Sequence, residues 1–276
     1  MKTLYISDLD GTLLQPNVEL SEATVQILNE LIDEGMFFTV ATARSIASAK
    51  PILKDVNITI PIVLMNGVCI FDLAKDKFIK IETLPKNSIA QLMTLIKEHN
   101  LKGFAYTIHD GMMSTYYEDI SHPALRNFVQ ERVSRYRKPF TQIDDFASLS
   151  EEPLIYYSLM DEREILEPVY QALQKIEELN CVFYKDNYVP GLWYLEIYSK
   201  SASKYHAVQF LKEEYNFDQV VCFGDNRNDL PLFEASNIKL AVGNAVEELK
   251  EKADQVIDMN TSDGVAMWLK GNFKSL

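Results

Sequence analysis

The sequence predicts an α/β protein with a parallel sheet, interrupted by a large inserted α+β domain. Short, continuous apolar runs alternate with amphipathic helical patterns at both ends of the chain, as expected for parallel strands joined by helices. Between residues 83 and 198 this rhythm gives way to hairpin signals. A chain of 276 residues is long enough for two domains. We therefore expect a core made of residues 1–82 and 199–276 and an inserted domain made of residues 83–198.

The first expected strand begins at Thr3 and ends in a cluster of polar residues. Because side chains alternate along a strand, Asp8 and Asp10 can converge on one side while Leu9 points to the other. Gly11 permits a turn that other residues resist. Open α/β sheets bind ligands at the carboxyl ends of their strands. We interpret this segment as part of a site rather than a solvated acidic turn, because three downstream segments fit the same site.

The rest of the core alternates between helices and buried strands. Residues 22–35 carry an apolar stripe at helical spacing, with Ser21 as the expected N-cap and Gly35 as the stop. Residues 36–41 form an apolar run that is typical of a strand buried on both faces. The other core elements are expected at 60–65 (strand), 68–71 with 78–81 (hairpin), 203–215 (helix), 219–223 (strand), 230–235 (helix), 238–242 (strand), 247–253 (helix), 255–258 (strand) and 264–269 (helix).

The inserted domain mixes helices with antiparallel strands. Residues 104–109 and 112–117 alternate around Asp110-Gly111, which is a hairpin signal. The other expected elements are helices at 86–100, 123–136 and 162–178, and strands at 154–160, 181–185 and 194–198. We interpret the many aromatic residues of this domain first as packing residues. The candidates for substrate contact are His109, Tyr116, Tyr188, Trp193 and Tyr194.

The composition limits the class of partner. A net charge of −13 and a pI near 4.8 argue against nucleic acid and anionic membranes. No stretch is long enough to span a membrane, and the first residues do not form a signal peptide. Cys69, Cys181 and Cys222 show no zinc-binding spacing, so we expect buried thiols in a reducing compartment. The expected class is a cytoplasmic enzyme with a small-molecule substrate, either a monomer or a homodimer.

Four core elements carry polar residues that suit catalysis: Asp8 with Asp10, Thr42, Lys204, and Asp225 with Asn228 and Asp229. These stretches closely resemble the four motifs of the haloacid dehalogenase (HAD) superfamily, in the order of its Cof-type phosphatases. The matching patterns are D-x-D-G-T-L-L, T-x-R, a lysine that opens a helix, and G-D-x-x-N-D. Further matches lie at 66–67, 241–245 and 263–266. The resemblance implies a Rossmann-like parallel-sheet core and, between the second and third motifs, a class IIB cap that selects the substrate.

Phosphate ester chemistry explains why such a site is rich in carboxylates. A metal ion offsets the charge repulsion between the ester and an incoming anion, and Mg²⁺ prefers oxygen ligands. We expect Asp8, Asp225 and the backbone carbonyl of Asp10 to hold Mg²⁺, with Asp229 in its outer shell. The resemblance implies that Asp8 attacks phosphorus and forms an aspartyl-phosphate. Asp10 would be the general acid and base, with a pKa raised by the carboxylates around it.

Other residues of the motifs are expected to bind the phosphoryl group. These are the Thr42 hydroxyl, the backbone N–H groups of Leu9 and Ala43, the Lys204 ammonium and the Asn228 amide. Each has an ordinary alternative. Thr42 could be a helix N-cap, and Lys204 could be a surface lysine whose role belongs to Lys200. Asp225 and Asp229 could merely stabilise the N-terminus of the following helix through its dipole.

Arg44 and two departures from the family pattern leave questions open. Arg44 follows the motif threonine and is either a contact to substrate or cap, or a structural ion pair. Ala43 stands where the family usually has Gly, which should preserve the backbone donor. Tyr205 stands where Gly usually follows the lysine, and it either narrows the phosphate pocket or faces the core. Neither departure removes a catalytic group.

The predicted function is a Mg²⁺-dependent phosphatase acting on small phosphate monoesters. By resemblance, the substrates would be sugar phosphates, nucleotides or cofactor phosphates such as pyridoxal phosphate. One alternative is a phosphomutase, which hands the phosphoryl group to a second hydroxyl. Another is a non-catalytic regulatory protein that binds a phosphorylated metabolite.

Overall fold

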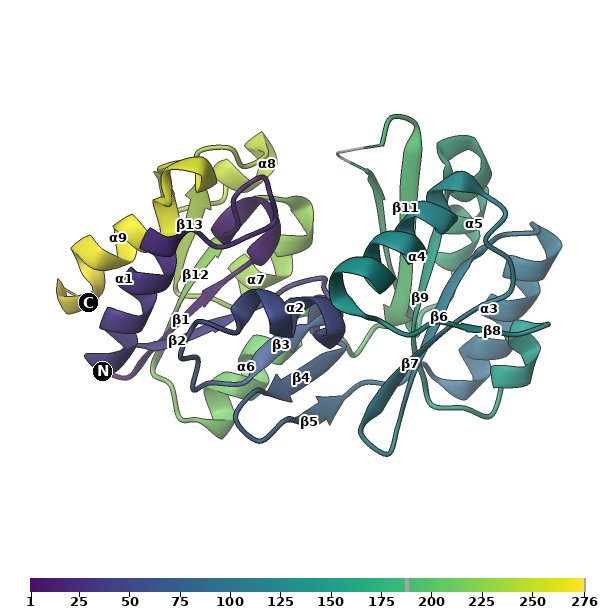
Figure 1. Cartoon of the computed structure of the whole chain (residues 1–276), viewed down its shortest axis with the longest axis horizontal. Coiled ribbons are helices and arrows are strands. Elements are labelled where there is room, and N and C mark those ends of the chain that lie inside the picture. Colours follow the sequence, from purple (N-terminus) through teal and green to yellow (C-terminus); the bar gives the residue numbers. More distant parts are fainter. Residues whose placement is uncertain (187–188, 276) are drawn as a thin grey trace. The chain divides into compact units, whose positions relative to one another are not determined.

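The computed structural model describes residues 1–186 and 189–275, which fold into two compact units (Figure 1). The core unit comprises Met1–Lys80 and Ser203–Leu276, and the cap unit comprises Ile81–Ala202. The sequence pattern predicts the corresponding boundaries at residues 82 and 199, within a few residues of these. Tyr188, one of the candidates for substrate contact, lies outside the described residues.

A parallel sheet forms the centre of the core unit. Its strand order is β14-β13-β12-β1-β2, and all of its pairings are parallel. The strands are β1 (Thr3–Ser7), β2 (Phe37–Val40), β12 (Gln219–Gly224), β13 (Ile238–Val242) and β14 (Gln255–Ile257). Every residue of the central strand β1 is buried, as its continuous apolar pattern predicts. The predicted α/β class is confirmed.

Helices connect these strands. They are α1 (Glu22–Asp33), α2 (Ile46–Leu53), α6 (Lys204–Glu214), α7 (Leu230–Glu234), α8 (Glu247–Lys250) and α9 (Gly264–Asn272). Helix α1 packs against α9, next to both ends of the chain (Figure 1). The Ser21 hydroxyl accepts a hydrogen bond from the backbone N–H of Thr24 at 2.9 Å, so the predicted N-cap of α1 is confirmed.

The expected third parallel strand, residues 60–65, is wrong in its length and its pairing. Strand β3 covers only Ile62–Leu64 and pairs antiparallel with β4 (Cys69–Asp72), which lies beside β5 (Lys77–Ile81) in a separate sheet. A single parallel bridge joins Val63 to Ala41. The strand stops because Met65 and Asn66 adopt left-handed backbone angles, with φ of 50° and 56°. That conformation bends the chain into a turn instead of continuing the strand.

The cap unit is an antiparallel sheet with helices. The strand order is β10-β11-β9-β6-β7-β8, and only the short β7–β8 pairing is parallel. The strands are β6 (Gly103–His109), β7 (Met112–Tyr117), β8 (Thr141–Gln142), β9 (Leu154–Glu162), β10 (Leu179–Lys185) and β11 (Leu192–Ser199). The helices are α3 (Lys86–Glu98), α4 (Pro123–Tyr136) and α5 (Arg163–Leu173). The helix expected at 162–178 therefore ends early, at Leu173.

The apolar core of the cap unit lies between α3, α5 and one face of this sheet. Ile89 and Leu92 of α3 and Leu166 of α5 are buried in one cluster with sheet residues such as Leu159 and Leu195. Burying such side chains gives about 2 kcal/mol each. The other face is also packed, because Phe128 of α4 stacks on Phe104 of β6 there and both Phe104 and Leu125 are fully buried.

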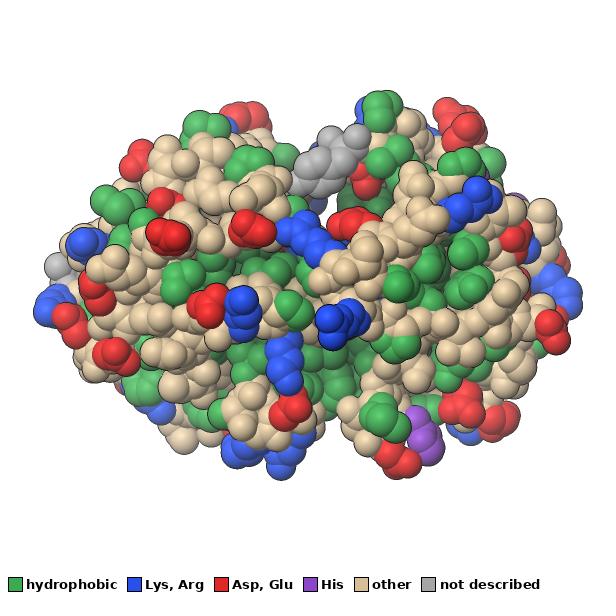
Figure 2. Space-filling model, in the orientation of Figure 1, with side chains coloured by type: hydrophobic (Ala, Val, Ile, Leu, Met, Phe, Trp, Pro, Cys, Tyr) green, Lys and Arg blue, Asp and Glu red, His purple; other side chains and the backbone are tan. Residues whose placement is uncertain are grey.

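Among the described residues, no helix has both the length and the hydropathy of a membrane span. Figure 2 shows carboxylates mixed with Lys and Arg side chains over the face in view. All three cysteines are free; Cys69 and Cys222 are buried as expected, whereas Cys181 is half-buried.

Candidate active site

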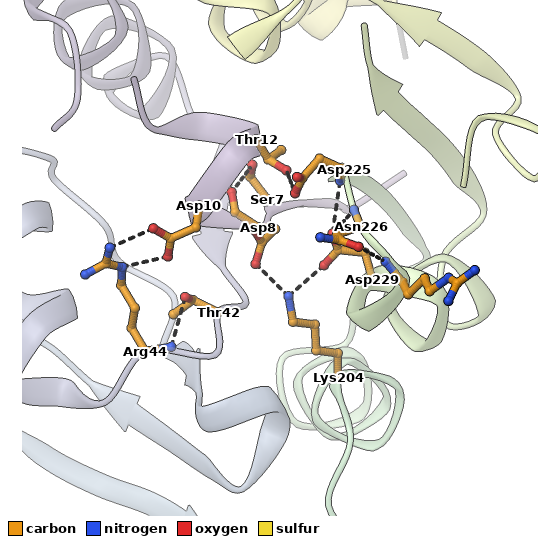
Figure 3. A network of polar contacts seen from close by, with 11 residues as sticks. Ser7, Asp8, Asp10, Thr12, Thr42, Arg44, Lys204, Asp225, Asn226 and Asp229 are labelled. Carbon is orange, nitrogen blue, oxygen red and sulfur yellow. Dashed lines mark hydrogen bonds and ion pairs between the residues drawn. The ribbon is translucent and has the colours of Figure 1, made fainter. Parts of the chain in front are cut away.

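The predicted site residues of the core unit gather at the carboxyl edge of its parallel sheet (Figure 3). Asp8 directly follows β1, and its backbone N–H donates to the carbonyl of Phe223 in the neighbouring strand β12 at 3.0 Å. Asp225 directly follows β12, and Thr42 lies two residues beyond the end of β2. Parallel pairing thus brings together side chains that are far apart in the sequence.

Lys204 joins two of the carboxylates. Its Nζ atom lies 2.6 Å from Asp8 Oδ1 and 2.7 Å from Asp229 Oδ1. The three side chains are almost completely buried, with exposed fractions of 1%, 5% and 0%. Burial alone would lower the pKa of Lys204, but Asp229 and Asp8 outweigh it and hold this pKa above its usual value. Lys204 is therefore a permanent cation. Lys200, the sequence alternative, is exposed and belongs to the cap unit.

The second carboxylate of the edge, Asp225, is held by the turn after β1. Thr12 donates its hydroxyl hydrogen to Asp225 Oδ1 at 2.9 Å. Gly11 adopts φ of +80°, and a Cβ atom there would lie 2.3 Å from Asp225 Oδ2, so only glycine fits. Burial, reinforced by the nearby Asp229 charge, raises the pKa of Asp225 to about 7.

Asp229 holds the turn on the opposite side. Its Oδ2 atom accepts the backbone N–H groups of Asp225 at 3.0 Å and Asn226 at 3.1 Å. Its Oδ1 atom accepts from Lys204, so this one carboxylate positions both the turn and the lysine. Asn228 lies half-buried in the same turn. A helix-dipole role alone does not explain these contacts.

Asp10 is paired with Arg44. Arg44 donates from Nε to Asp10 Oδ2 at 2.7 Å and from the second guanidinium nitrogen to Oδ1 at 2.6 Å. In Figure 3 the Asp10 side chain points toward Arg44 and away from Lys204. Of the two roles that the sequence left open for Arg44, the structure shows an ion pair, and its partner is a predicted catalytic residue.

Thr42 lies buried beside this pair. Its hydroxyl oxygen accepts the backbone N–H of Arg44 at 3.1 Å, which leaves the hydroxyl hydrogen available to a ligand. The N-cap of α2 is Ser45, so Thr42 is not a helix cap. Ala43 lies between Thr42 and Arg44, and Leu9 lies between the two aspartates. The phosphate-binding roles of Leu9, Ala43, Lys204 and Asn228 remain predictions.

Several residues that position the site have no role in the sequence prediction. Thr12 and Asn226, with the contacts given above, are two of them. Asn244 donates from Nδ2 to the carbonyl of Gly11 at 2.7 Å, which fixes the turn that follows β1. A Cβ atom at Gly67 would lie 2.1 Å from the carbonyl oxygen of Ser203, so Gly67 lets α6 begin close to the sheet edge. The motif matches at 66–67 and 241–245 were the available signal.

The candidates in the cap unit have different positions. His109 is exposed near the tip of the β6–β7 hairpin, where its Nδ1 lies 3.3 Å from Asp110. Tyr116 and Trp193 pack against the apolar cluster on the sheet face that α3 and α5 cover. Tyr194 follows Trp193 in β11 and so lies on the opposite face.

The core cluster fits a divalent cation. Oxygen atoms of Asp8, Asp225 and Asp229 lie within 4.8 Å of one another. Burial raises the pKa of Asp8, and the charges of Asp229, Asp225 and Asp10 raise it further against the attraction of Lys204. Three carboxylates, of which that of Asp225 is half-buried and the other two are buried, surround one ammonium, so the acidic groups outnumber the cation. Oxygen donors with excess negative charge suit Mg²⁺, and Asp229 belongs to this cluster as closely as the other two.

Comparisons with known proteins agree with this geometry. A family profile described as haloacid dehalogenase-like hydrolase matches residues 5–269. The chain is 25% identical to the pyridoxal phosphate phosphatase of Escherichia coli over 95% of both chains. It is also 25% identical to a 5-amino-6-(5-phospho-D-ribitylamino)uracil phosphatase of Bacillus subtilis, over 98% of this chain and 97% of the other.

The fold is shared with solved structures. A haloacid dehalogenase-like hydrolase from Bacteroides thetaiotaomicron matches with a TM-score of 0.81 and 22% identity, over 98% of this chain and 99% of that chain. The expectation of a hydrolase is confirmed by the family match. The chain belongs to the family of haloacid dehalogenase-like hydrolases.

Proposed function

We propose that the protein is a Mg²⁺-dependent phosphatase of small phosphate monoesters, with Asp8 as the nucleophile. The observation that carries this proposal is the buried contact of Lys204 with Asp8 and Asp229, beside Asp225 at the sheet edge. Lys204 holds Asp8 by Oδ1 only. In the described part of the chain Asp8 Oδ2 has no hydrogen-bond partner, so this oxygen is available to attack phosphorus.

In the first step Asp8 Oδ2 forms a bond to phosphorus while the bond from phosphorus to the leaving oxygen breaks. This produces an aspartyl-phosphate on Asp8 and an alkoxide that needs a proton. Asp10 would supply that proton and would later remove one from the water that attacks the aspartyl-phosphate. Arg44 holds both carboxylate oxygens of Asp10, so we propose that this contact loosens before Asp10 transfers a proton.

Other groups of the core unit would bind the phosphoryl oxygens. The Thr42 hydroxyl and the Lys204 ammonium are donors, and the backbone N–H groups of Leu9 and Ala43 and the Asn228 amide are further candidates. Asp8, Asp225 and the Asp10 backbone carbonyl would hold Mg²⁺, with Asp229 beside them. When bound, the metal would neutralise charge on the phosphate so that an anionic nucleophile can approach.

The range of substrates is proposed from the relatives. One relative is named for pyridoxal phosphate and another for a phosphorylated ribitylaminouracil, so cofactor-type phosphate esters are the first class to test. Sugar phosphates and nucleotides form the rest of the panel. We propose that the cap unit selects among them. The three free cysteines support a reducing, cytoplasmic setting, and a monomer or homodimer is expected.

The test is phosphate release from this panel with Mg²⁺ and with a chelator, for the wild-type protein and Asp8→Asn. The amide keeps the shape of the carboxylate but removes the nucleophile, so we expect a loss of about 10³-fold or more. Asp55→Asn, an exposed aspartate of the core unit, is the matched control. Turnover that requires a bisphosphate activator would identify a phosphomutase. Binding of phosphate esters without turnover would identify a regulatory protein.

A further inference from the structure

A buried left-handed turn lies between two parts of the candidate active site in the core unit. It comprises Met65, Asn66 and Gly67, whose φ angles are 50°, 56° and 99°. Glycine adopts such angles freely, whereas Met and Asn incur a steric cost that is larger for Met. Strained turns persist only where their neighbours hold them, and they cluster at functional sites. The contacts of this turn therefore decide whether it does more than end β3.

The turn holds the segment that follows β2 by two carbonyl groups. The backbone N–H of Asn66 donates to the carbonyl of Thr42 at 3.0 Å, and the backbone N–H of Met65 donates to the carbonyl of Arg44 at 3.1 Å. In an extended strand, consecutive N–H groups point to opposite edges. The left-handed angles let both N–H groups reach the same segment, as in other turns that present successive donors.

The hydrogen bond from Asn66 fixes the direction of a predicted phosphate donor. The Thr42 carbonyl and the Ala43 N–H belong to one planar trans peptide group, in which they point in opposite directions. Because the carbonyl points to Asn66, the Ala43 N–H points away from the turn.

The direction away from the turn leads to the side of β1. Ala41, two residues before Ala43, donates its N–H to the carbonyl of Ser7 in β1 at 2.9 Å. N–H groups two residues apart share an edge of an extended segment, so the Ala43 N–H has the same orientation. Strand β1 ends at Ser7, and in the described chain no hydrogen bond joins the Ala43 N–H to another residue. An open donor thus faces the space beside Asp8.

The same turn limits the position of Lys204. A Cβ atom at Gly67 would lie 2.1 Å from the carbonyl oxygen of Ser203 and 2.8 Å from the backbone nitrogen of Lys204. The first residues of α6 therefore pack directly on the turn. A change in the backbone angles of the turn should displace both the segment after β2 and Lys204.

We infer that the Met65–Gly67 turn is a positioning element of the active site, with Asn66 as its central residue. Its backbone orients the Ala43 N–H toward a phosphoryl oxygen and keeps Lys204 against Asp8. Asn66 is a positioning residue, because it acts through Ala43 and Lys204 and not by touching the substrate. This inference rests on the proposed phosphatase function. It concerns the phosphoryl group alone, so it holds for any leaving group.

Two substitutions at residue 66 separate the backbone from the side chain. Asn66→Gly removes the amide and keeps both the left-handed angles and the N–H, so kcat/KM should stay within about 3-fold of the wild-type value. Asn66→Val also removes the amide, but a β-branched residue strongly disfavours these angles. Here kcat/KM should fall at least about 10-fold, the effect of one hydrogen bond to a charged group. Asn66→Ala should lie between the two and replaces Asn66→Val if that variant does not fold.

Asn216 provides the matched control. It is an exposed asparagine of the core unit with φ of 53°, and its backbone N–H donates to the carbonyl of Glu213 at the end of α6. Asn216→Val imposes the same backbone strain away from the site, so it should lower Tm and keep the wild-type kcat/KM. If Asn66→Val also loses only Tm, the turn is merely structural and the inference is overturned. A loss of kcat/KM in Asn66→Gly as large as in Asn66→Val would assign the effect to the amide and would overturn it too.

Binding of inorganic phosphate gives a readout that does not depend on turnover. Calorimetry with Mg²⁺ compares the wild-type protein, Asn66→Gly and Asn66→Val. The Kd of phosphate should rise about 10-fold in Asn66→Val alone, because the Ala43 N–H is no longer directed at a phosphoryl oxygen.

The two readouts distinguish this inference from the proposed function. Equal Kd values in the three proteins overturn the inference, and hydrolysis of esters by the wild-type protein then still supports the phosphatase. If the wild-type protein binds phosphate but hydrolyses no ester, the proposed function fails, and the Kd series alone decides the role of the turn. If the wild-type protein binds no phosphate, both are overturned.

Discussion

The core and cap units each bury a lysine, and they treat its charge in opposite ways. Lys204 lies within 2.7 Å of two carboxylates, and its pKa is held above the usual value. Lys138 lies against two aromatic rings, and its pKa is lowered to about 7. Burial acts on both in the same direction, so the partner decides the result. The core lysine is a fixed cation of the proposed active site, whereas the cap lysine has no carboxylate partner among the described residues.

Removing the charge of Lys204 should have the largest effect on turnover and stability. Lys204→Met leaves Asp8 and Asp229 buried without a counter-ion, which should cost about 3–5 kcal/mol in the free energy of unfolding. We expect phosphate release to fall by about 10³-fold or more, because Asp8 also loses its positioning. Initial rates and urea unfolding measure the two effects. Lys200→Met is the control, and a larger loss in that variant would move the role of the motif lysine to residue 200.

Gly11→Ala tests whether the turn after β1 must leave room for Asp225. The new Cβ atom would lie 2.3 Å from Asp225 Oδ2, so the carboxylate has to move. We expect turnover to fall at least about 10-fold and stability to fall by about 2 kcal/mol.

Gly111→Ala in the cap unit is the matched control. Gly111 has φ of +77°, close to the +80° of Gly11, but nothing lies within 4 Å of the position that an alanine methyl group would take there. It should lose about 1 kcal/mol from backbone strain alone and keep its turnover. Equal effects of the two substitutions on kcat would show that strain, not the contact with Asp225, matters at residue 11.

Arg44→Ala tests the ion pair that holds Asp10. If Arg44 positions this carboxylate between turnovers, its removal should lower kcat by about 10-fold and leave KM nearly unchanged, because the general acid and base is then less well placed. Lys50→Ala breaks an exposed ion pair with Asp76 in the same unit and should change neither. A rise in KM with an unaltered kcat would instead assign Arg44 to substrate binding.

The smallest effect is a pH-dependent change in stability at Lys138. Between its folded pKa of about 7 and its ordinary value of 10.5, the unfolded chain binds a proton that the folded chain does not. The free energy of unfolding therefore rises with pH in this range, and the burial penalty is greatest at pH 7 and below. Lys138→Met removes the penalty, so it should raise Tm at pH 7 and have little effect near pH 10. A Tm difference that is independent of pH would contradict the lowered pKa.

The same contrast explains what the sequence could predict. In the core unit, short apolar strands end in polar motifs, and parallel pairing brings those ends together, so the sequence pattern predicts that Asp8, Thr42 and Asp225 converge, whereas Lys204 was assigned to the site by the family resemblance. The failure at residues 60–65 arose because Met65 and Asn66 adopt left-handed angles without a glycine to signal them. The exact place of Asp229 depends on a lysine 25 positions earlier.

The cap unit offered weaker signals. Strands β6, β9 and β11 were recognisable, but both faces of the sheet are rich in aromatic residues, so alternation did not separate the face under α3 and α5 from the face that carries Tyr156 and Tyr198. Lys138 stands between Arg137 and Pro139, in a basic stretch whose composition is typical of an exposed segment. Its burial depends on Tyr106 and Phe140, and the first of these is far away in sequence. Glu196 could be assigned to a face only through its pairing with β9 and β10.

The central claim, that Asp8 is the nucleophile held by Lys204, is tested most directly by trapping the covalent intermediate. The protein is mixed with Mg²⁺ and a hydrolysed ester, quenched in acid within milliseconds, digested and analysed by mass spectrometry. The account predicts that the peptide containing Asp8 gains the mass of one phosphoryl group, and that Asp8→Asn does not. Phosphate release that continues in Asp8→Asn, or a phosphoryl group found on another residue, would contradict it.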